Sequence, residues 1–263
     1  MKTVVVTGAA SGMGAAVRRR MLADGCGVIG VDLRAAGVQA DLSTTQGRAA
    51  AIDAVLSQSG GRIDQLVCCA GLGPHVDPAT LVASVNYFGV VALLDGLFDA
   101  LRQGAQPCAV VVSSNSATLQ SWDGSPLRDA YLANDEAGVL AMLAAAAQAQ
   151  ATRDQAGYIA YASSKHAVTA AARQRALAWG RAGVRLNVVA PGAVETPLLQ
   201  AGLADPRYGD AIRDFVAPLG RRARPEEVAE LVAFLCGPQA AYLHGSVLFI
   251  DGGLDAAQRP LRF

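Results

Sequence analysis

Short apolar runs rich in β-branched residues recur along the chain and alternate with longer, helix-like segments. The runs are TVVV from Thr3, GVIGVD from Gly27, IDQLVCC from Ile63, AVVVSS from Ala109, VRLNVVAP from Val184 and SVLFID from Ser246, with a briefer GVQAD from Gly37. The helix-like segments span residues 12–24, 44–58, 78–103, 161–181 and 225–236. Because the runs lack polar alternation and are separated by helices, they predict a parallel sheet buried on both faces.

The chain has no Pro- or Gly-rich linker and no internal repeat, so it predicts one doubly wound α/β domain over residues 1–263. About seven parallel strands would form its centre, flanked by helices. Two segments interrupt the alternation. Residues 115–157 combine a turn-like SWDGSPLRD with the helix-favouring NDEAGVLAMLAAAAQAQATRD, which predicts an extra helical segment. Residues 193–224 contain three prolines and predict a long substrate loop.

Composition narrows the class of protein. The apolar fraction is 52%, and 22 basic residues balance 22 acidic ones, which gives no reason to expect nucleic acid or a membrane surface as partner. No apolar run approaches the ~18 residues that span a bilayer, and the amino terminus enters a strand without a leader, so we expect a cytoplasmic protein. The five cysteines form no CxxC pair and the three histidines are scattered, so we expect buried thiols and no metal site.

A glycine-rich loop directly follows the first predicted strand. TGAASGMG places Gly8, Gly12 and Gly14 where a helix begins. Glycines let the backbone turn sharply and approach a diphosphate, and the free N–H groups of the helix start attract its negative charge. A plain strand-to-helix turn is the alternative, and the flanking strand and helix favour the phosphate-binding interpretation.

Asp32 ends the second predicted strand, in GVDLR. A carboxylate there can accept both ribose hydroxyls of adenosine and would repel a 2′-phosphate, which favours NAD over NADP as cofactor. Arg34 leaves the opposite assignment open, although the glycine loop adds no second cation. A solvated turn residue is the other interpretation of Asp32.

Tyr161 and Lys165 lie four residues apart in YASSK, so on a helix they share one face. A phenol normally keeps its proton until pH ~10. The lysine ammonium and an oxidised nicotinamide would both favour the phenolate, so Tyr161 could exchange a proton with an alcohol or carbonyl oxygen. Taken alone, the pair also fits an ordinary exposed helix surface.

Six motifs in order along the chain resemble those of the short-chain dehydrogenase/reductase family. They are TGAASGMG, CCAG at 68–71, VNYFG at 85–89, VVVSS at 110–114, YASSK at 161–165 and APGAVETP at 190–197. The resemblance covers nearly the whole chain. It implies a Rossmann-type domain and metal-free hydride transfer between NAD(H) and an alcohol or ketone.

The resemblance also implies roles for individual residues. Ser114, rather than Ser113, would hold the reacting oxygen against Tyr161, and Lys165 would also bind the nicotinamide ribose. Asn86 would organise a water for proton relay, or would instead mark a helix kink satisfied by backbone contact. The implied cofactor contacts are Gly8, Ser11, Gly12, Met13, Gly14, Asp32, Leu33, Asp41, Leu42, Ala70, Gly71, Tyr161, Lys165, Pro191, Gly192, Val194 and Thr196.

Within that set, Asp41 and Leu42 would meet the adenine, and the segment from Pro191 to Thr196 would bracket the nicotinamide. Cys69 stands where the family usually has a version of this motif containing asparagine, so backbone contacts are expected to stabilise the sheet there.

The predicted substrate pocket is mostly apolar, which suits a hydrophobic alcohol or ketone better than a sugar or an acid. Its candidates are Leu72, Gly73, Pro74, Asn115, Ser116, Tyr158, Leu198, Leu199, Leu203, Tyr208 and Phe215. An apolar loop that merely docks on the core is the alternative.

The resemblance suggests a homodimer formed through residues 225–253, with segment 115–157 removing another interface or only shielding its own domain. A dehydrogenase of terpenoid or aryl alcohols and a non-catalytic NAD-sensing protein are the rival functions.

Overall fold

A parallel sheet of seven strands forms the centre of the part of the chain that the computed structural model describes, residues 1–150 and 155–261. Its order is β3-β2-β1-β4-β5-β6-β7. The strands are β1 Thr3–Thr7, β2 Gly27–Asp32, β3 Val38–Gln39, β4 Gln65–Cys68, β5 Cys108–Val112, β6 Arg185–Pro191 and β7 Val247–Ile250. All seven strands expected from the apolar runs are confirmed. The strand order reverses between β1 and β4, which is where doubly wound sheets bind their ligands.

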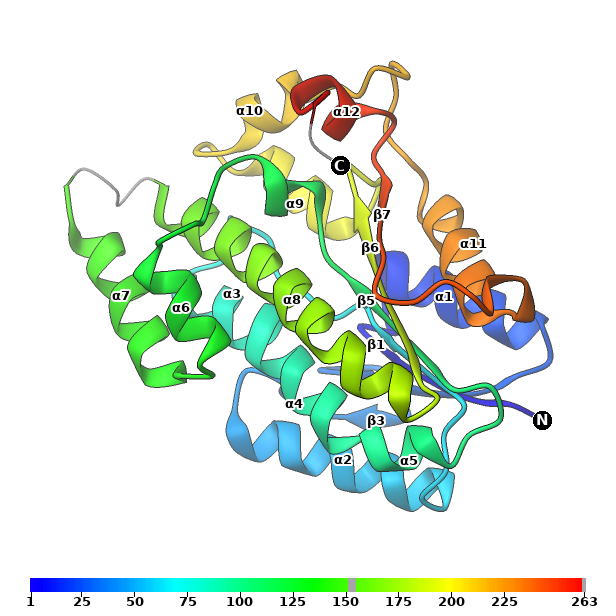
Figure 1. The fold of residues 1–263 in the computed structure, drawn as a ribbon. Coiled ribbons are helices and arrows are strands. Elements are labelled where there is room, and N and C mark those ends of the chain that lie inside the picture. Colours follow the sequence, from blue (N-terminus) through cyan, green and yellow to red (C-terminus); the bar gives the residue numbers. More distant parts are fainter. Residues whose placement is uncertain (151–154, 262–263) are drawn as a thin grey trace.

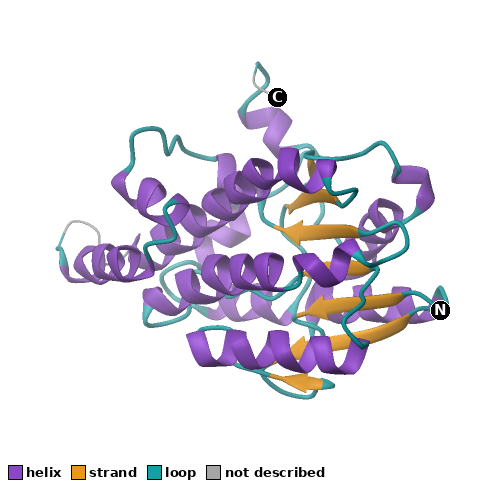
Figure 2. Cartoon of the chain, turned by 60° about the horizontal axis from the view of Figure 1, so that its bottom comes forward, coloured by secondary structure: helices purple, strands orange, loops and turns teal. Residues whose placement is uncertain are grey.

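Helices cover both faces of the sheet (Figure 1). Helices α1 (Gly12–Ala23) and α11 (Pro225–Cys236) pack on one face, and α2 (Thr45–Ser59), α4 (Val90–Gly96) and α8 (Ala156–Arg181) pack on the other. Figure 2 shows the strands side by side with helices packed over them. The period of two along each strand divides the core: Val4 and Val6 join the α1–α11 side, while Val5 joins the α8 side.

The stretch predicted as one helix over 78–103 is interrupted. It consists of α3 (Ala79–Ala83), a π-helical turn η1 (Ser84–Gly89), α4, and α5 (Phe98–Arg102). By length and composition Ala79–Gly96 could cross a membrane, so the expectation that no apolar run is long enough was wrong. Two thirds of this stretch (67%) is buried inside the domain, as in a core helix.

The extra helical segment is confirmed between β5 and α8. It holds a 3-10 turn η2 (Asn115–Thr118), α6 (Pro126–Leu132) and α7 (Glu136–Gln148), which pack beside α3 and α8 (Figure 1). SWDGSPLRD is not a turn throughout, because Pro126 occupies the first position of α6, where its missing N–H costs nothing. Helix α8 begins at Ala156 rather than 161, and residues 151–154 of the predicted segment lie outside the described residues.

The segment 193–224 is not a loop throughout, because it contains α9 (Pro197–Ala204) and α10 (Gly209–Asp214). Thr196 caps α9 by accepting a hydrogen bond from Leu199 N, and Pro197 follows at its first position. The chain ends with η4 (Pro238–Ala240), β7 and α12 (Leu254–Gln258). Helices α9, α10 and α12 gather at one end of the sheet (Figure 1).

Candidate active site

A cleft of about 540 Å³ opens at the carboxyl ends of β1, β2, β4 and β5, where the strand order reverses. Most of the predicted cofactor contacts line it. They are Gly8, Ser11, Gly12, Met13, Gly14, Asp32, Leu33, Asp41, Leu42, Ala70, Gly71, Tyr161, Lys165 and Thr196. Residues from five distant parts of the sequence therefore share one cavity.

The glycine loop at one end of this cleft needs its glycines. Gly8 and Gly12 have φ angles of 67° and 52°, which side chains rarely tolerate. A Cβ on Gly14 would collide with the carbonyl oxygen of Gly8. Ser11 precedes α1 in an extended conformation and makes no side-chain cap, so the first turn of α1 keeps N–H groups for a ligand. This geometry fits the diphosphate of a dinucleotide.

Asp32 lies beside the loop at the end of β2. Its Oδ2 accepts a hydrogen bond from Ala10 N at 3.0 Å, which holds the carboxylate in front of the glycines. Among the described residues that line the cleft, Lys165 is the only lysine or arginine, and Arg34 is exposed outside it. The cleft therefore fits a ribose with free hydroxyls better than one carrying a 2′-phosphate.

Tyr161, Lys165 and Ser114 converge at the other end of the cleft. Lys165 Nζ lies 5.9 Å from the centroid of the Tyr161 ring and donates to Val112 O at 3.0 Å, at the end of β5. Ser114 follows β5, and its Oγ accepts a hydrogen bond from Ser116 Oγ at 2.9 Å. The sheet thus brings a strand end against one face of α8.

Burial has the largest influence on the pKa values of this group. Burial raises the pKa of Tyr161, while hydrogen bonds from Ser114 and then Ser116 oppose that rise. The Lys165 ammonium is directed to the Val112 carbonyl. Burial also lowers the pKa of Lys165 to about 8, against a smaller opposing influence of Cys69. Without a cofactor, desolvation dominates both groups.

Ser113 and Ser114 have different surroundings. Only Ser113 is part of the cleft lining. The Ser113 hydroxyl donates to Lys165 O at 3.0 Å and lies 2.7 Å from Thr169 Oγ1. It is therefore already engaged with α8. The Ser114 hydroxyl instead forms a hydrogen bond with the Tyr161 phenol. The geometry supports Ser114 as the residue next to the reacting oxygen.

Asn86 is fully buried in the π-helical turn and does not line the cleft. Its Oδ1 accepts from Leu72 N at 2.7 Å, and its Nδ2 donates to Leu72 O at 3.0 Å and to Ser164 Oγ at 3.4 Å. The helix kink with backbone contact is therefore present. The Gly71 Cβ position lies 3.3 Å from Asn86 Oδ1 and 3.4 Å from Lys165 Nζ, so Gly71 keeps the space between them free of a side chain. The water relay stays a prediction.

Three predicted cofactor residues lie outside the cleft lining. Pro191 ends β6, Gly192 N donates to Ile250 O at 3.1 Å, and Val194 is buried and pairs with Ala223. They form the frame that carries Thr196, whose Cγ2 lies 3.2 Å from the Gly12 Cβ position.

Sequence reasoning missed Thr7. Its Oγ1 accepts from Ala70 N at 3.0 Å, so a side chain joins β1 to the segment after β4 where backbone contacts alone were expected. A hydroxyl residue that ends a buried strand just before the glycines was the readable signal. Other lining residues that were missed are Ala40, Ser43, Cys69, Val76, Leu81, Val85, Val112 and Pro197.

Only some of the residues predicted to form the substrate pocket line the cleft. Leu72 and Leu198 line the cleft together with Val76, Leu81 and Val85, whereas Phe215 lines a separate cavity of about 90 Å³. The other pocket candidates named from the sequence are not part of the cleft lining.

Two close approaches join segments next to this region. A Cβ on Gly157 would collide with Pro74 O and approach Tyr208 Oη to 2.7 Å. Arg207 donates to His75 O at 3.0 Å and pairs with Asp77 at 3.0 Å, so it ties the segment between α9 and α10 to the residues after β4.

Comparisons with known proteins place this fold and site in a class. Residues 127–255 match a family model described as enoyl-(acyl carrier protein) reductase. Several full-length relatives exceed 30% identity, and the chain belongs to the short-chain dehydrogenase/reductase family of oxidoreductases.

Within the family, the chain is 50% identical over the full length of both proteins to 3-alpha-hydroxysteroid dehydrogenase/carbonyl reductase of Comamonas testosteroni. The solved structure of 3-alpha-hydroxysteroid dehydrogenase from Pseudomonas sp. B-0831 complexed with NADH matches with a TM-score of 0.94 and 52% identity, covering both chains completely. Coniferyl-alcohol dehydrogenase of a Pseudomonas species is 34% identical over 96% of each chain.

Proposed function

We propose that this protein transfers a hydride between NAD(H) and a hydrophobic secondary alcohol or ketone, with the 3α-hydroxyl or 3-ketone of a steroid as the substrate group. The convergence of Tyr161, Ser114 and Lys165 at one end of a dinucleotide-shaped cleft carries this proposal. The full-length identity to a hydroxysteroid dehydrogenase supports the substrate class.

The chain holds the cofactor through residues at both ends of the cleft. The glycine loop and the start of α1 bind the diphosphate, Asp32 accepts the adenosine ribose hydroxyls, and Asp41 with Leu42 meets the adenine. Thr196 and Lys165 orient the nicotinamide end. The bound nicotinamide supplies the carbon that gives or accepts the hydride.

Tyr161 transfers the proton. Because burial raises its pKa, the phenol is protonated near neutral pH and can donate to the oxygen of a ketone under reduction. Ser114 holds that oxygen by a hydrogen bond. In the oxidative direction Tyr161 must first lose its proton, and the Lys165 ammonium together with the positive charge of NAD⁺ favours the phenolate. Alcohol oxidation is therefore expected to rise with pH.

The apolar wall of the cleft supports a hydrophobic substrate. Leu72, Val76, Leu81, Val85 and Leu198 line the cleft, and none of their side chains can hydrogen-bond a hydroxyl-rich or charged molecule. The 34% identity to coniferyl-alcohol dehydrogenase favours an aryl alcohol as the second candidate. A purely NAD-sensing protein would have no use for Tyr161, Lys165 and Ser114 together.

A substrate screen that follows NADH absorbance tests this proposal, with androstane 3α-alcohols, bile acids, monoterpene alcohols and aryl alcohols, each with NAD and with NADP. We expect turnover of the steroid alcohols with NAD. Turnover of only the small alcohols would refute the steroid assignment. Tyr161→Phe should abolish turnover and spare NADH binding; unchanged turnover would remove Tyr161 from the reaction, and NADH binding without turnover in the parent protein would favour the sensing function.

A homodimer and a cytoplasmic location also belong to this proposal. Strand β7 is the edge of the sheet and is half-buried throughout, and Phe234 on the neighbouring α11 is 43% exposed, which suits contact with a second copy. All five cysteines are free thiols, as a reducing compartment maintains them. Light scattering of the purified protein and fractionation of cells test the two statements; a monomer or a membrane-bound fraction would contradict them.

A further inference from the structure

We propose that the inserted helix α7 controls the adenine end of the cofactor cleft through an ion pair between Glu136 and Arg48. Both are positioning residues, since neither is part of the cleft lining. The inference rests on the proposed NAD(H) function. It gives the segment between β5 and α8 a part in cofactor binding.

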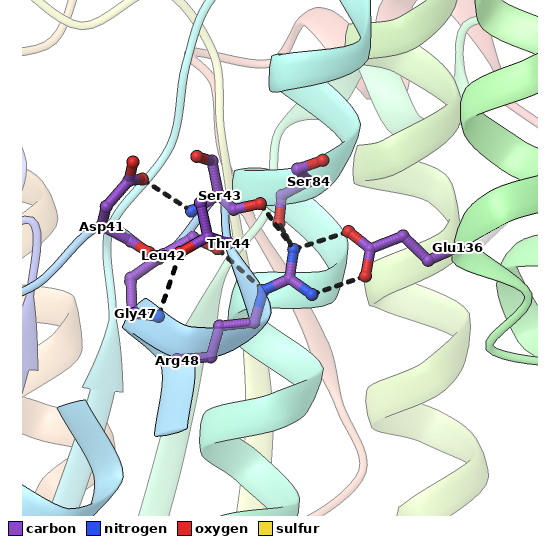
Figure 3. Close-up of polar contacts among 8 residues, drawn as sticks. All are labelled: Asp41, Leu42, Ser43, Thr44, Gly47, Arg48, Ser84 and Glu136. Carbon is purple, nitrogen blue, oxygen red and sulfur yellow. Dashed lines mark hydrogen bonds and ion pairs between the residues drawn. The ribbon is translucent and has the colours of Figure 1, made fainter. Parts of the chain in front are cut away.

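Arg48 contacts residues 42–43, Ser84 and Glu136 directly through hydrogen bonds (Figure 3). It lies in the first turns of α2, and its side chain is only 7% exposed. Its Nε donates to Leu42 O at 2.8 Å, and its Nη2 donates to Ser43 O at 3.2 Å and to Ser84 O at 3.1 Å. We call residues 41–44, which precede α2, the adenine segment. The planar guanidinium thus binds two carbonyls of the adenine segment and one carbonyl of the π-helical turn.

The carbonyls that Arg48 holds belong to residues that shape the site. Leu42 and Ser43 line the cleft, and a Cβ on Gly89 would come within 3.1 Å of Leu42 Cβ, so this segment lies tight against the turn. Ser84 begins the same turn that carries Asn86, whose amide holds both backbone groups of Leu72. Arg48 therefore joins the adenine segment to the scaffold beneath the reactive end.

The rest of the adenine segment is held by local contacts. Ser43 N donates to Asp41 Oδ1 at 2.9 Å, and Gly47 N donates to Thr44 Oγ1 at 3.0 Å, where Thr44 caps α2. These bonds fix the shape of the segment but do not attach it to the other side of the cleft. Arg48 makes that attachment with charge-assisted hydrogen bonds, which are stronger than neutral ones.

Glu136 supplies the matching charge. Its carboxylate receives both Nη1 and Nη2 of Arg48 at 2.7 Å, in the bidentate geometry that orients a guanidinium (Figure 3). It is the only carboxylate paired with Arg48 among the described residues. Its place in the first turn of α7 is itself favourable for a negative charge.

Removing that carboxylate leaves a buried cation with no opposite charge, facing carbonyl oxygens and the ring of Phe88 at 5.7 Å. An uncompensated buried charge is costly, and the side chain can reduce the cost by turning toward water. Arg48 would then release Leu42 O, Ser43 O and Ser84 O, and the adenine segment would lose its attachment. Helix α7 does not need the pair for its packing, because Val139 and Leu143 are buried on its other turns.

The test measures affinity at the two ends of the cofactor separately. In Glu136→Gln we expect the Kd for NADH, by fluorescence titration, and the Kd for AMP, by calorimetry, to rise roughly tenfold, as for the loss of one charge-assisted contact. The Kd for nicotinamide mononucleotide and kcat at saturating NAD should change less than about twofold, because the reactive end is intact. Glu136→Asp, which keeps the charge, should recover part of the affinity.

Asp95→Asn is the matched control. Asp95 on α4 accepts hydrogen bonds from Nε and Nη2 of Arg175 on α8, at 2.8 and 2.7 Å, and neither residue lines the cleft. The control should leave every one of these constants unchanged.

Three results would overturn the inference: unchanged NADH and AMP affinity in Glu136→Gln, equal weakening in Asp95→Asn, or equal weakening of both cofactor halves. Should Glu136→Gln not fold, Arg48→Lys tests the same idea, since an ammonium keeps the charge but loses the fork, and it should weaken AMP more than nicotinamide mononucleotide. Absence of NADH binding by the parent protein would instead refute the proposed function.

Discussion

Replacing Lys165 by Met should stabilise the cofactor-free protein at neutral pH while it abolishes turnover. Lys165 is 6% exposed, and burial lowers the pKa of its ammonium from 10.5 to about 8. At about 1.4 kcal/mol per pH unit, the charged form costs the folded state about 3 kcal/mol at pH 7. The variant also loses the hydrogen bond to Val112 O, which offsets about 1 to 2 kcal/mol of the stabilisation gained by removing the charge. Lys165→Met is therefore expected to be about 1 to 2 kcal/mol more stable than the parent at pH 7.

The pH dependence gives a sharper form of this prediction. The folded pKa of Lys165 lies below the unfolded one, so between about pH 8 and 10.5 the unfolded chain binds more protons and parent stability rises with pH. Lys165→Met lacks this gain, and its advantage should shrink by about 1.4 kcal/mol between pH 7 and pH 9. Cys69 stays neutral over this range, because burial raises the pKa of its thiol to about 12.

Urea unfolding followed by circular dichroism at pH 7 and pH 9 measures the difference. Lys2→Met, which removes the chain's other lysine, is the control and should show the same difference from the parent at both pH values. A Lys165→Met protein clearly less stable than the parent at pH 7, or an advantage that does not change with pH, would refute the claim that the ammonium is held at a cost. The charged form of Lys165 would then not destabilise the folded protein.

Further predictions concern the two ends of the cleft and its outer side. Ser114→Ala should lower kcat by roughly 10²-fold with an unchanged Kd for NADH, and should move the pH profile of alcohol oxidation upward, because the pKa of Tyr161 loses its largest lowering influence; a normal kcat would remove Ser114 from the reaction. Asp32→Asn should reduce the preference for NAD over NADP, as the ratio of kcat/KM values, by roughly tenfold, because the charge repelling a 2′-phosphate is gone; an unchanged ratio would place the discrimination elsewhere. Arg207→Gln should raise KM for steroid alcohols severalfold while the Kd for NADH stays constant, since it unties the two sides of the substrate region; an equal rise of both constants would point to general loosening.

Local patterns in the sequence were sufficient for the strands and the dinucleotide end. Runs of β-branched residues specify buried strands, while Gly8 and Gly12 have φ angles that few other residues adopt and Gly14 has no room for a Cβ. Thr196 followed by Pro197 was an equally local signal for the start of α9, which the abundance of proline in that segment obscured.

Long-range features could not be predicted from local patterns. Arg48 and Glu136 are 88 positions apart, and each is an ordinary helix residue in its own segment. The direction of the Lys165 ammonium depends on the Val112 carbonyl at the end of another element, and the burial that raises the pKa of Tyr161 arises only in the folded chain, so spacing alone gave the neighbours of Tyr161 but not these influences. The π-helical turn around Asn86 likewise depends on the backbone of Leu72, which only the folded chain brings near.

Because a side chain at position 157 would strike the Pro74 carbonyl and crowd the Tyr208 hydroxyl, this position beside the substrate region has room for glycine alone. Libraries that aim to change which alcohols are accepted therefore gain nothing at position 157 and have more freedom in α9 at Leu198, whose side chain lines the cleft.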